Sequence, residues 1–294
     1  MNLSTNNTPS LDQAVLAMNA QADHTVSTAD TGSAGQHSGS FGDLPAMAYE
    51  STQRPAAKHR VSVIIPALNE AENLPYVLPR VPAWIDEVML VDGNSTDNTV
   101  EVARRLRPDI RIVQQQGRGK GAALRTGFAA ATGDIIVMLD ADGSTDPGEM
   151  ELFIQVLCNG ADFVKASRFI QGAGTSDMPL YRQFGNEALT MLVRLLFGGR
   201  FSDLCYGYNA FWARVLPLLE LDGDGFEIET MMNVRALRAG LKVVEMPSFE
   251  SERVHGEGRL RTIPDGWRVL KTIFKERLRP YRPATHNLKH PTAS

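Results

Sequence analysis

Residues 135–146 read IIVMLDADGSTD, an apolar run that ends in two neighbouring carboxylates. The run from Ile135 to Leu139 predicts a short strand that is buried on both faces of a sheet. Asp140 and Asp142 follow it directly. Open parallel α/β sheets bind ligands beyond the carboxyl ends of their strands, so this pair can hold a divalent cation and leave coordination positions for phosphate oxygens. A turn rich in Asp and Gly that only bends the backbone explains the same residues equally well.

Two earlier segments repeat this order of buried strand and polar loop. The sequence VSVIIP at 61–66 is followed by residues 67–70, and a strand predicted at 87–91 is followed by residues 92–97. A further strand is predicted at 110–114, and helices are predicted from residue 72, at 98–107 and at 122–131. Strands that alternate with helices are typical of βαβ units and of a mainly parallel sheet. The polar loops 67–70, 92–97 and 140–146 are therefore expected at one edge, and their repetition favours a ligand-binding crevice over a purely local turn.

The second half of the chain continues with both kinds of element. Helices are predicted at 147–159, 183–197, 226–239 and 266–277, and strands at 163–166 and 242–247. We expect a mobile loop at 171–177 and a turn-like, aromatic segment at 203–211. One side of helix 183–197 carries an apolar stripe that is predicted to face the core, with a lipid tail as the alternative contact. The stripe consists of Leu189, Leu192, Val193, Leu196 and Phe197.

Composition and charge exclude several classes of protein. The net charge of -4 gives no general attraction to nucleic acid, so no nucleic-acid partner is expected. The two cysteines, Cys158 and Cys205, are too few and too far apart for a disulfide framework or a zinc site. No apolar run reaches the roughly 18 residues that span a bilayer, so we expect a cytoplasmic protein, with peripheral contact at the inner membrane face.

The chain is expected to contain one working domain. Residues 1–58 are rich in small and polar residues and predict a flexible, disordered N-terminal leader. Residues 59–279 are expected to form the working domain, and residues 280–294 a C-terminal tail. The glycine-rich loop 117–121 lacks both the triphosphate-binding and the dinucleotide-binding order of glycines. Lys120 in that loop is therefore predicted either to contact a ligand or to be a solvated helix cap.

Five motifs in order resemble the family 2 glycosyltransferases, within them the dolichol-phosphate mannosyltransferase-like branch. They are VSVIIPALNE at 61–70, VDGNSTDNT at 91–99, GKGAAL at 119–124, GDIIVMLDADG at 133–143, and the later SRF and GYNAF. The resemblance covers residues 61–277. It implies a GT-A fold with a mainly parallel central sheet and flanking helices, a nucleotide-sugar donor, a divalent metal (Mg²⁺ or Mn²⁺) and inversion at the anomeric carbon. The acceptor that it implies carries a phosphate, with a polyprenyl phosphate first and a small molecule second.

The resemblance also implies roles for residues of this chain. Pro66, Ala67, Glu70 and Asp92 would contact the nucleoside of the donor, and Asp140, Ala141 and Asp142 would be the metal-binding triplet. We add Asn69, Gly93 and Lys120 from the neighbouring loops to the predicted donor-binding residues, together with Asp140 and Ala141. The metal would be held by Asp140 and Asp142. For the acceptor phosphate the resemblance implies Arg168 and Arg253, and the clustering of arginines in the second half of the chain adds Arg182 and Arg259 as predicted acceptor-binding residues. The chain departs from the branch at Ser144, where a Gln is frequent, at Asn209, where a Lys or Arg is found, and at 258–259, where Gly-Arg replaces Ser-Lys.

The choice of acceptor decides whether a general base is needed. A phosphate acceptor is already anionic near neutral pH, whereas a hydroxyl acceptor needs a base, for which Asp203 is the candidate. A turn aspartate that bonds its own backbone is the alternative interpretation of Asp203. Transfer to a soluble hydroxyl acceptor is therefore an alternative function. A non-catalytic nucleotide-sugar-binding or scaffold protein is the alternative from another class.

Overall fold

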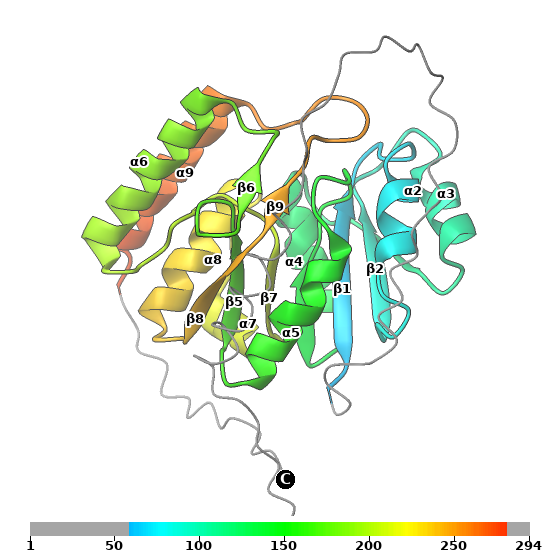
Figure 1. Ribbon diagram of the computed structural model, residues 1–294, viewed down its shortest axis with the longest axis horizontal. Helices are drawn as coiled ribbons and strands as arrows, with labels where there is room; N and C mark the ends of the chain where they lie inside the picture. The colour runs from blue at the N-terminus through cyan, green and yellow to red at the C-terminus, as the bar shows by residue number, and fades with distance from the viewer. Residues whose placement is uncertain (1–58, 281–294) are drawn as a thin grey trace, which may run out of the picture. The chain divides into compact units, whose positions relative to one another are not determined.

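The computed structural model describes residues 59–280, which contain a seven-stranded sheet with helices packed against it (Figure 1). The predicted leader and all but the first residue of the predicted tail lie outside these residues. The strand order is β3-β2-β1-β4-β7-β5-β8. These strands are β1 (Val61–Ala67), β2 (Glu87–Asp92), β3 (Arg111–Gln114), β4 (Ile135–Met138), β5 (Phe163–Ser167), β7 (Asn209–Trp212) and β8 (Val243–Pro247).

The first half of the sheet is parallel, as the alternation of strands and helices predicts. β1 pairs in parallel with β2 on one side and with β4 on the other, and β3 extends the sheet beyond β2. The chain therefore reverses its direction of growth between β1 and β4. In an open α/β sheet this switch point is where neighbouring loops diverge and leave a crevice. The fold thus places the loops after β1, β2 and β4 around one position.

The helices follow the predicted positions with small shifts in their ends, except for the short α7, which was not predicted. They are α2 (Leu74–Val77), α3 (Thr99–Leu106), α4 (Lys120–Ala130), α5 (Met150–Cys158), α6 (Leu180–Phe197), α7 (Leu216–Leu219), α8 (Glu227–Arg238) and α9 (Thr262–Leu278). Short 3₁₀ turns lie at Leu78–Arg80, Pro147–Glu149 and Ala213–Val215. In Figure 1, α5 lies in front of the sheet and α4 behind it, while α6 and α9 lie together at one side.

Two predictions of local structure were wrong. The end of the segment predicted as an aromatic turn, Asn209–Trp212, forms β7, which runs antiparallel between β4 and β5. Its residues are all buried, and Phe211 stacks on Phe163 with ring centroids 5.3 Å apart. Part of the segment predicted as a loop forms β6 (Gly174–Thr175), which pairs in parallel with β9 (Phe249–Glu250). Both pairings are long-range, so a local pattern of residues does not reveal them.

The predicted apolar stripe of helix α6 faces the core. Val193 is fully buried in a cluster with Val269 and Ile273 of α9 and Val234 of α8. The other four stripe residues are partly buried against the same cluster. The shared cluster therefore packs helices α6, α8 and α9 against one another. Helix α9 begins four residues earlier than predicted, because Thr262 to Asp265 already form its first turn.

Candidate active site

The loops after β1 and β2 are joined by hydrogen bonds at the switch point. The Gly93 amide donates to the Ala67 carbonyl at 2.8 Å, and the Thr96 amide donates to Asn69 Oδ1 at 2.7 Å. Asn69 has a φ of 51°, a left-handed conformation that Asn tolerates better than most residues. Asp92 is buried at the end of β2 and accepts from the Ser95 amide at 3.2 Å. The loops therefore form one preorganised wall of polar groups.

Asp140, just beyond β4, contacts a lysine whose side chain is only 15% exposed. Lys120 Nζ lies 2.7 Å from Asp140 Oδ1 and 3.0 Å from Glu229 Oε1. Burial alone lowers the pKa of Lys120, but the two carboxylates raise it above its usual value, so the ammonium stays charged. Burial raises the pKa of Glu229, and Lys120 opposes that rise. Lys120 is thus neither a solvated cap nor a freely exposed side chain: it is the cation between two carboxylates.

The backbone makes room for this charge cluster at Gly207. A Cβ atom at residue 207 would lie 2.7 Å from Lys120 Nζ, 3.2 Å from Asp140 Oδ2 and 3.2 Å from Glu229 Oε1. The glycines that flank Lys120 have a similar packing role, because a Cβ at Gly121 would lie 2.5 Å from the Gly223 carbonyl oxygen. The glycine-rich loop therefore docks against residues 223–225, which brings Lys120 to the end of β4.

Asp142 contacts an arginine from the far end of the chain. Its Oδ1 accepts from the Ser144 amide at 3.1 Å, and its Oδ2 lies 3.5 Å from Arg253 Nη1. Arg253 Nη2 also pairs with Glu70 Oε2. Burial first, and the neighbouring charge of Asp140 second, raise the pKa of Asp142, because two close carboxylates repel each other.

These donors fit a divalent metal. Asp140 and Asp142 offer carboxylate oxygens, which are the ligands that Mg²⁺ and Mn²⁺ prefer. Their mutual repulsion is a cost that a bound cation would remove. Within residues 59–280 no group of three or more His, Cys, Asp or Glu side chains could hold a metal by itself. A metal here would therefore take its remaining ligands from a bound anion or from water.

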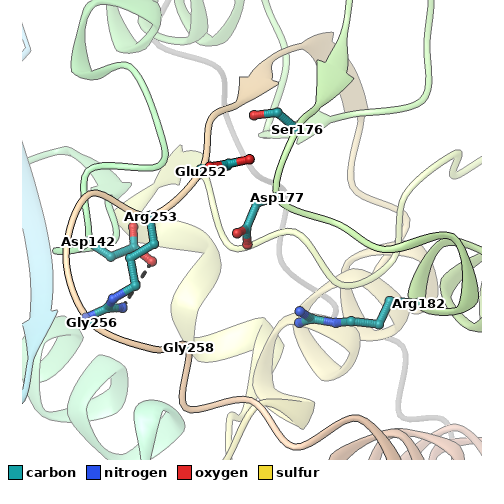
Figure 2. Close-up of a pocket in the computed structure, with 8 residues that line it drawn as sticks. All are labelled: Asp142, Ser176, Asp177, Arg182, Glu252, Arg253, Gly256 and Gly258. Carbon is teal, nitrogen blue, oxygen red and sulfur yellow. Dashed lines mark hydrogen bonds and ion pairs between the residues drawn. The ribbon is translucent and has the colours of Figure 1, made fainter. Parts of the chain in front are cut away.

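Two polar cavities share Arg253, and Asp142 lines the first of them. The first, about 310 Å³, is lined by Asp142, Ser176, Asp177, Arg182, Glu252, Arg253, Gly256 and Gly258. Figure 2 shows Arg253 against Asp142 on one side of it and Arg182 extending into it from α6 on the other. The second, about 510 Å³, lies over the loops after β1 and β2, and Asn69, Asp97, Arg253, His255 and Arg259 are among its lining residues. Arg253 lines both cavities.

The loop that carries Arg253 is held by hydrogen bonds against the loop after β1. Asn73 Oδ1 accepts from the His255 amide at 2.8 Å, and Asn73 Nδ2 donates to Glu70 at 2.6 Å. The His255 ring lies 5.4 Å from the Tyr76 ring, and Arg259 donates to the Leu68 carbonyl at 2.5 Å. The loop between β9 and α9, which carries Arg253, therefore covers the segment that follows β1.

The comparisons with known proteins agree with this geometry. The sequence model described as Glycosyl transferase family 2 matches residues 62–216. The chain belongs to glycosyl transferase family 2. Like other members of the family, it is a glycosyltransferase that uses a nucleotide sugar, and its α/β architecture is the GT-A fold that the sequence predicts.

Relatives of this family 2 member include two polyprenyl-phosphate enzymes by name. The dolichol-phosphate mannosyltransferase of Pyrococcus furiosus is 30% identical over 232 residues, which are 76% of this chain and 63% of that protein. The polyprenol monophosphomannose synthase of Mycolicibacterium smegmatis is 31% identical over 76% of this chain and 88% of its own length. This chain thus spans less than two thirds of the P. furiosus protein.

Solved structures share the fold. Glucosyl-3-phosphoglycerate synthase from Mycobacterium tuberculosis, in complex with Mn²⁺, UDP and glucosyl-3-phosphoglycerate, superposes with a TM-score of 0.61. It is 23% identical, and the match covers 81% of this chain and 87% of that one. At this identity the likeness establishes the GT-A fold of the glycosyltransferase.

The structure brings most of the predicted site residues together. The predicted donor residues lie at or beside the ends of β1, β2 and β4, Lys120 contacts Asp140, and Arg182 and Arg253 line the smaller cavity. The sequence reasoning missed three polar residues of that cavity, Ser176, Asp177 and Glu252. They lie beside the β6–β9 pair, and no motif in the sequence indicates that pairing. Glu229 lies in the first turn of α8, and its contact with Lys120 depends on the docking of that helix.

Asp203 and Arg168 form a buried ion pair. Arg168 Nε donates to Asp203 Oδ2 at 2.7 Å, and Arg168 Nη2 donates to Asp203 Oδ1 at 2.9 Å. The side chains are 4% and 0% exposed, and Arg168 Nη1 pairs with Glu250 at 2.9 Å. Asp203 therefore has no open oxygen for an acceptor hydroxyl, and Arg168 has no free nitrogen for an acceptor phosphate. The roles of Asp203 as a base and of Arg168 as an acceptor ligand stay predictions, and either role requires this ion pair to open.

Proposed function

We propose that this glycosyltransferase moves a hexose from a nucleotide diphosphate sugar to a polyprenyl phosphate, with inversion at the anomeric carbon and with a divalent metal. The observation that carries the proposal is the cavity in which Asp142 faces Arg182 and Arg253. A carboxylate suited to a metal and two guanidinium groups suited to an anion line the same space. The names of the P. furiosus and M. smegmatis relatives support this acceptor class.

The donor side of the site is formed by the ends of β1 and β2. Glu70 and Asp92 are buried carboxylates that can accept hydrogen bonds from the nucleoside, and backbone groups of Pro66, Ala67 and Gly93 lie beside them. Asn69 fixes the wall between them through its bond to Thr96. A nucleoside bound here extends its diphosphate toward Asp140, Ala141 and Asp142.

Asp140 and Asp142 would hold the metal. A bound Mg²⁺ or Mn²⁺ offsets the negative charge that builds up on the departing diphosphate. Lys120 keeps a positive charge beside Asp140 and can contact the same phosphates. Arg253 pairs with Glu70 and Asp142, so nucleotide binding must compete with that arginine.

The acceptor side needs cations more than it needs a base. A phosphate oxygen is anionic at neutral pH and can attack the anomeric carbon opposite the leaving diphosphate, which inverts the configuration. Arg182, Arg253 and Arg259 are the cationic residues available to hold that phosphate. The burial of Asp203 agrees with a reaction that uses no base at this position.

The donor is tested by thermal shift. UDP, GDP and their hexose conjugates are added with and without Mn²⁺ to the protein and to Asp142→Asn. A nucleotide at 100 times its dissociation constant stabilises the native state by about 2.7 kcal/mol, or roughly 5–10 °C in a chain of this size. We expect one nucleotide to stabilise the parent only with Mn²⁺ and to leave Asp142→Asn unchanged. A shift that is equal in parent and variant would contradict the metal assignment.

The acceptor is tested by transfer of radiolabelled hexose from that donor. A short polyprenyl phosphate should be glycosylated, and the matching polyprenol should not. Arg182→Gln should raise the KM for the phosphate about tenfold or more, because a charge-assisted contact is lost, while Arg104→Gln on the exposed face of α3 serves as the control. Transfer to the polyprenol, with kcat lost in Asp177→Asn or Glu252→Gln, would instead support a hydroxyl acceptor.

A further inference from the structure

Helices α6 and α9 each carry, among the described residues, a second apolar stripe whose side chains are about half to mostly exposed. On α6 the exposed stripe is Leu180, Tyr181, Phe184, Met191 and Leu195. On α9 it is Ile263, Trp267, Phe274 and Leu278. Several of these side chains are almost fully accessible: Leu195 is 77%, Ile263 84% and Leu278 83% exposed. Single exposed apolar residues need no explanation, but a gathered set of this size indicates an interaction surface.

The stripes lie opposite the buried faces of their helices. On α9 the positions 263, 267, 274 and 278 recur at helical spacing, and the buried residues Val269, Thr272, Ile273 and Glu276 lie on the other side of the same helix. On α6 the buried residues are Asn186, Thr190 and Val193. Since both helices bury these faces in one cluster and lie side by side (Figure 1), both exposed stripes point away from that cluster.

The charges around the stripes select the partner. The acidic residues of α9, Asp265 and Glu276, are buried, so its exposed charges are all positive: Arg268, Lys271, Lys275 and Arg277. Around the helix, Lys271 and Arg277 fall on opposite edges of the stripe. Lys271 Nζ also lies 5.6 Å from the Trp267 ring centroid. Glu187 is the exposed acid on the flank of the α6 stripe. An apolar stripe with a tryptophan and lysine or arginine edges is the pattern of helices that lie in an anionic membrane surface.

We propose that α6 and α9 form a docking surface for an anionic lipid bilayer. Phe184, Leu195, Trp267 and Phe274 enter the boundary between headgroups and acyl chains. Lys271 and Arg277, at the edges of the α9 stripe, pair with the headgroups, while Arg268 and Lys275 already pair with Asp265 and Asp222. No helix within residues 59–280 is long and apolar enough to cross a membrane, so the contact lies in the plane of the interface.

The position of this surface relates it to the smaller cavity. Arg182, in the first turn of α6, lines that cavity, and so do Arg253, Gly256 and Gly258, in the loop that leads into α9. Both helices therefore start beside the place where the acceptor phosphate is proposed to bind. Docking of α6 and α9 on a membrane would hold the cavity at the depth of the lipid headgroups, where the phosphate of a polyprenyl phosphate lies. This link between docking and the acceptor rests on the proposed function.

The test is flotation of the full-length protein with vesicles that contain no polyprenyl phosphate, so its result is independent of catalysis. The protein should float with mixed phosphatidylcholine and phosphatidylglycerol vesicles and should remain unbound with phosphatidylcholine alone. Phe184→Ser combined with Phe274→Ser should weaken binding about tenfold or more. Leu152→Ser, at an exposed apolar residue of α5, is the matched control and should bind like the parent.

The charge contribution is tested by a second pair of variants. Lys271→Glu combined with Arg277→Glu should weaken binding by roughly fivefold or more for each cation removed, and added salt should reduce the difference. Arg104→Glu combined with Arg105→Glu on α3 makes the same change in net charge away from the surface and should leave binding unchanged. These substitutions are at exposed positions, and an unchanged thermal midpoint confirms that each variant folds.

Trp267 reports the depth of the contact directly. Vesicles that contain brominated lipid should quench the tryptophan emission of the parent, and the quenching should be lost in Trp267→Phe although that variant still floats. Trp212 is buried and does not report the surface. Parent protein that does not float with anionic vesicles, or serine and glutamate variants that float as well as the parent, would overturn the proposal. So would a parent dimer in light scattering that the phenylalanine variants convert to a monomer without any vesicle binding, because a second copy would then occupy the surface.

Discussion

Replacing Asp203 by Asn should destabilise the fold rather than remove a catalytic base. The Asp203 carboxylate is 0% exposed and receives two hydrogen bonds from the side chain of an arginine that is 4% exposed. Asn has nearly the same shape but no charge, so the substitution leaves the Arg168 guanidinium with Glu250 as its remaining counter-charge. It also removes a negative charge near the buried Lys165.

The size of the effect follows from this burial. Removing one member of a buried ion pair costs about 3–5 kcal/mol, and the contact with Glu250 places the expected loss near the lower end, about 3 kcal/mol. In a domain of this size that corresponds to a thermal midpoint lower by roughly 6–12 °C. Asp109→Asn removes the partner of Arg107 in an ion pair whose carboxylate is 70% exposed and should cost no more than about 1 kcal/mol.

The pH dependence gives an independent check. Burial alone raises the pKa of Asp203, but Arg168 and Lys165 more than offset this and lower it below its usual value. A carboxylate whose folded pKa is lowered adds stability above its unfolded pKa of about 3.9, and this contribution is lost as the pH falls through the folded pKa. The difference between parent and variant should therefore be full at neutral pH and should shrink in acid.

Urea unfolding of parent, Asp203→Asn and Asp109→Asn from neutral to acid pH measures these differences. The reasoning is refuted if Asp203→Asn unfolds with the parent free energy while its kcat collapses. That combination would show that the carboxylate acts on the substrate and not on Arg168.

Three further changes test other parts of the structure. Glu229→Gln removes a negative charge beside Lys120 and Asp140. Mn²⁺ titrated in the presence of the stabilising nucleotide should therefore bind about tenfold more weakly. An unchanged affinity for Mn²⁺ would contradict a role of the Lys120–Glu229 pair in metal binding. Gly127→Ala places a Cβ 2.5 Å from Ile64 Cγ2, and the crowding should outweigh the better helix propensity and lower the free energy of unfolding by about 1–2 kcal/mol in urea. Burial raises the pKa of Glu149 to about 7, so the parent should lose stability as the pH rises from about 4.3 through 7, and Glu149→Gln should lose this dependence in thermal melts.

The sequence by itself determined the parallel half of the sheet and the polar loops at its edge. Runs such as Ile135 to Leu139 are apolar at every position, which is what a strand covered on both faces requires. Asp140 and Asp142 follow that strand directly in the chain, so their place at the strand end is a local property. The helices between strands fix a parallel order, and a parallel order gathers the strand ends at one edge.

The tertiary structure alone decided which charged groups meet. Arg253 pairs with Glu70 across 183 residues of sequence, and Arg168 pairs with Asp203 across 35. A sequence motif shows the residue types but does not show whether their charges face a ligand or one another. Arg168 was therefore assigned to the acceptor, although its partners on β9 and before β7 leave it buried.

The same limit applies to β7 and to helices α6 and α9. The residues Asn209 to Trp212 become a central strand because β4 and β5 leave a place between them, which no local pattern records. Helix α6 has apolar residues on two sides, and the sequence indicated only the stripe that contains Val193. Hydrophobic periodicity shows that a helix face is apolar, but only the packing of α6, α8 and α9 decides which face is buried and which remains exposed, because burial depends on the neighbours that the fold supplies.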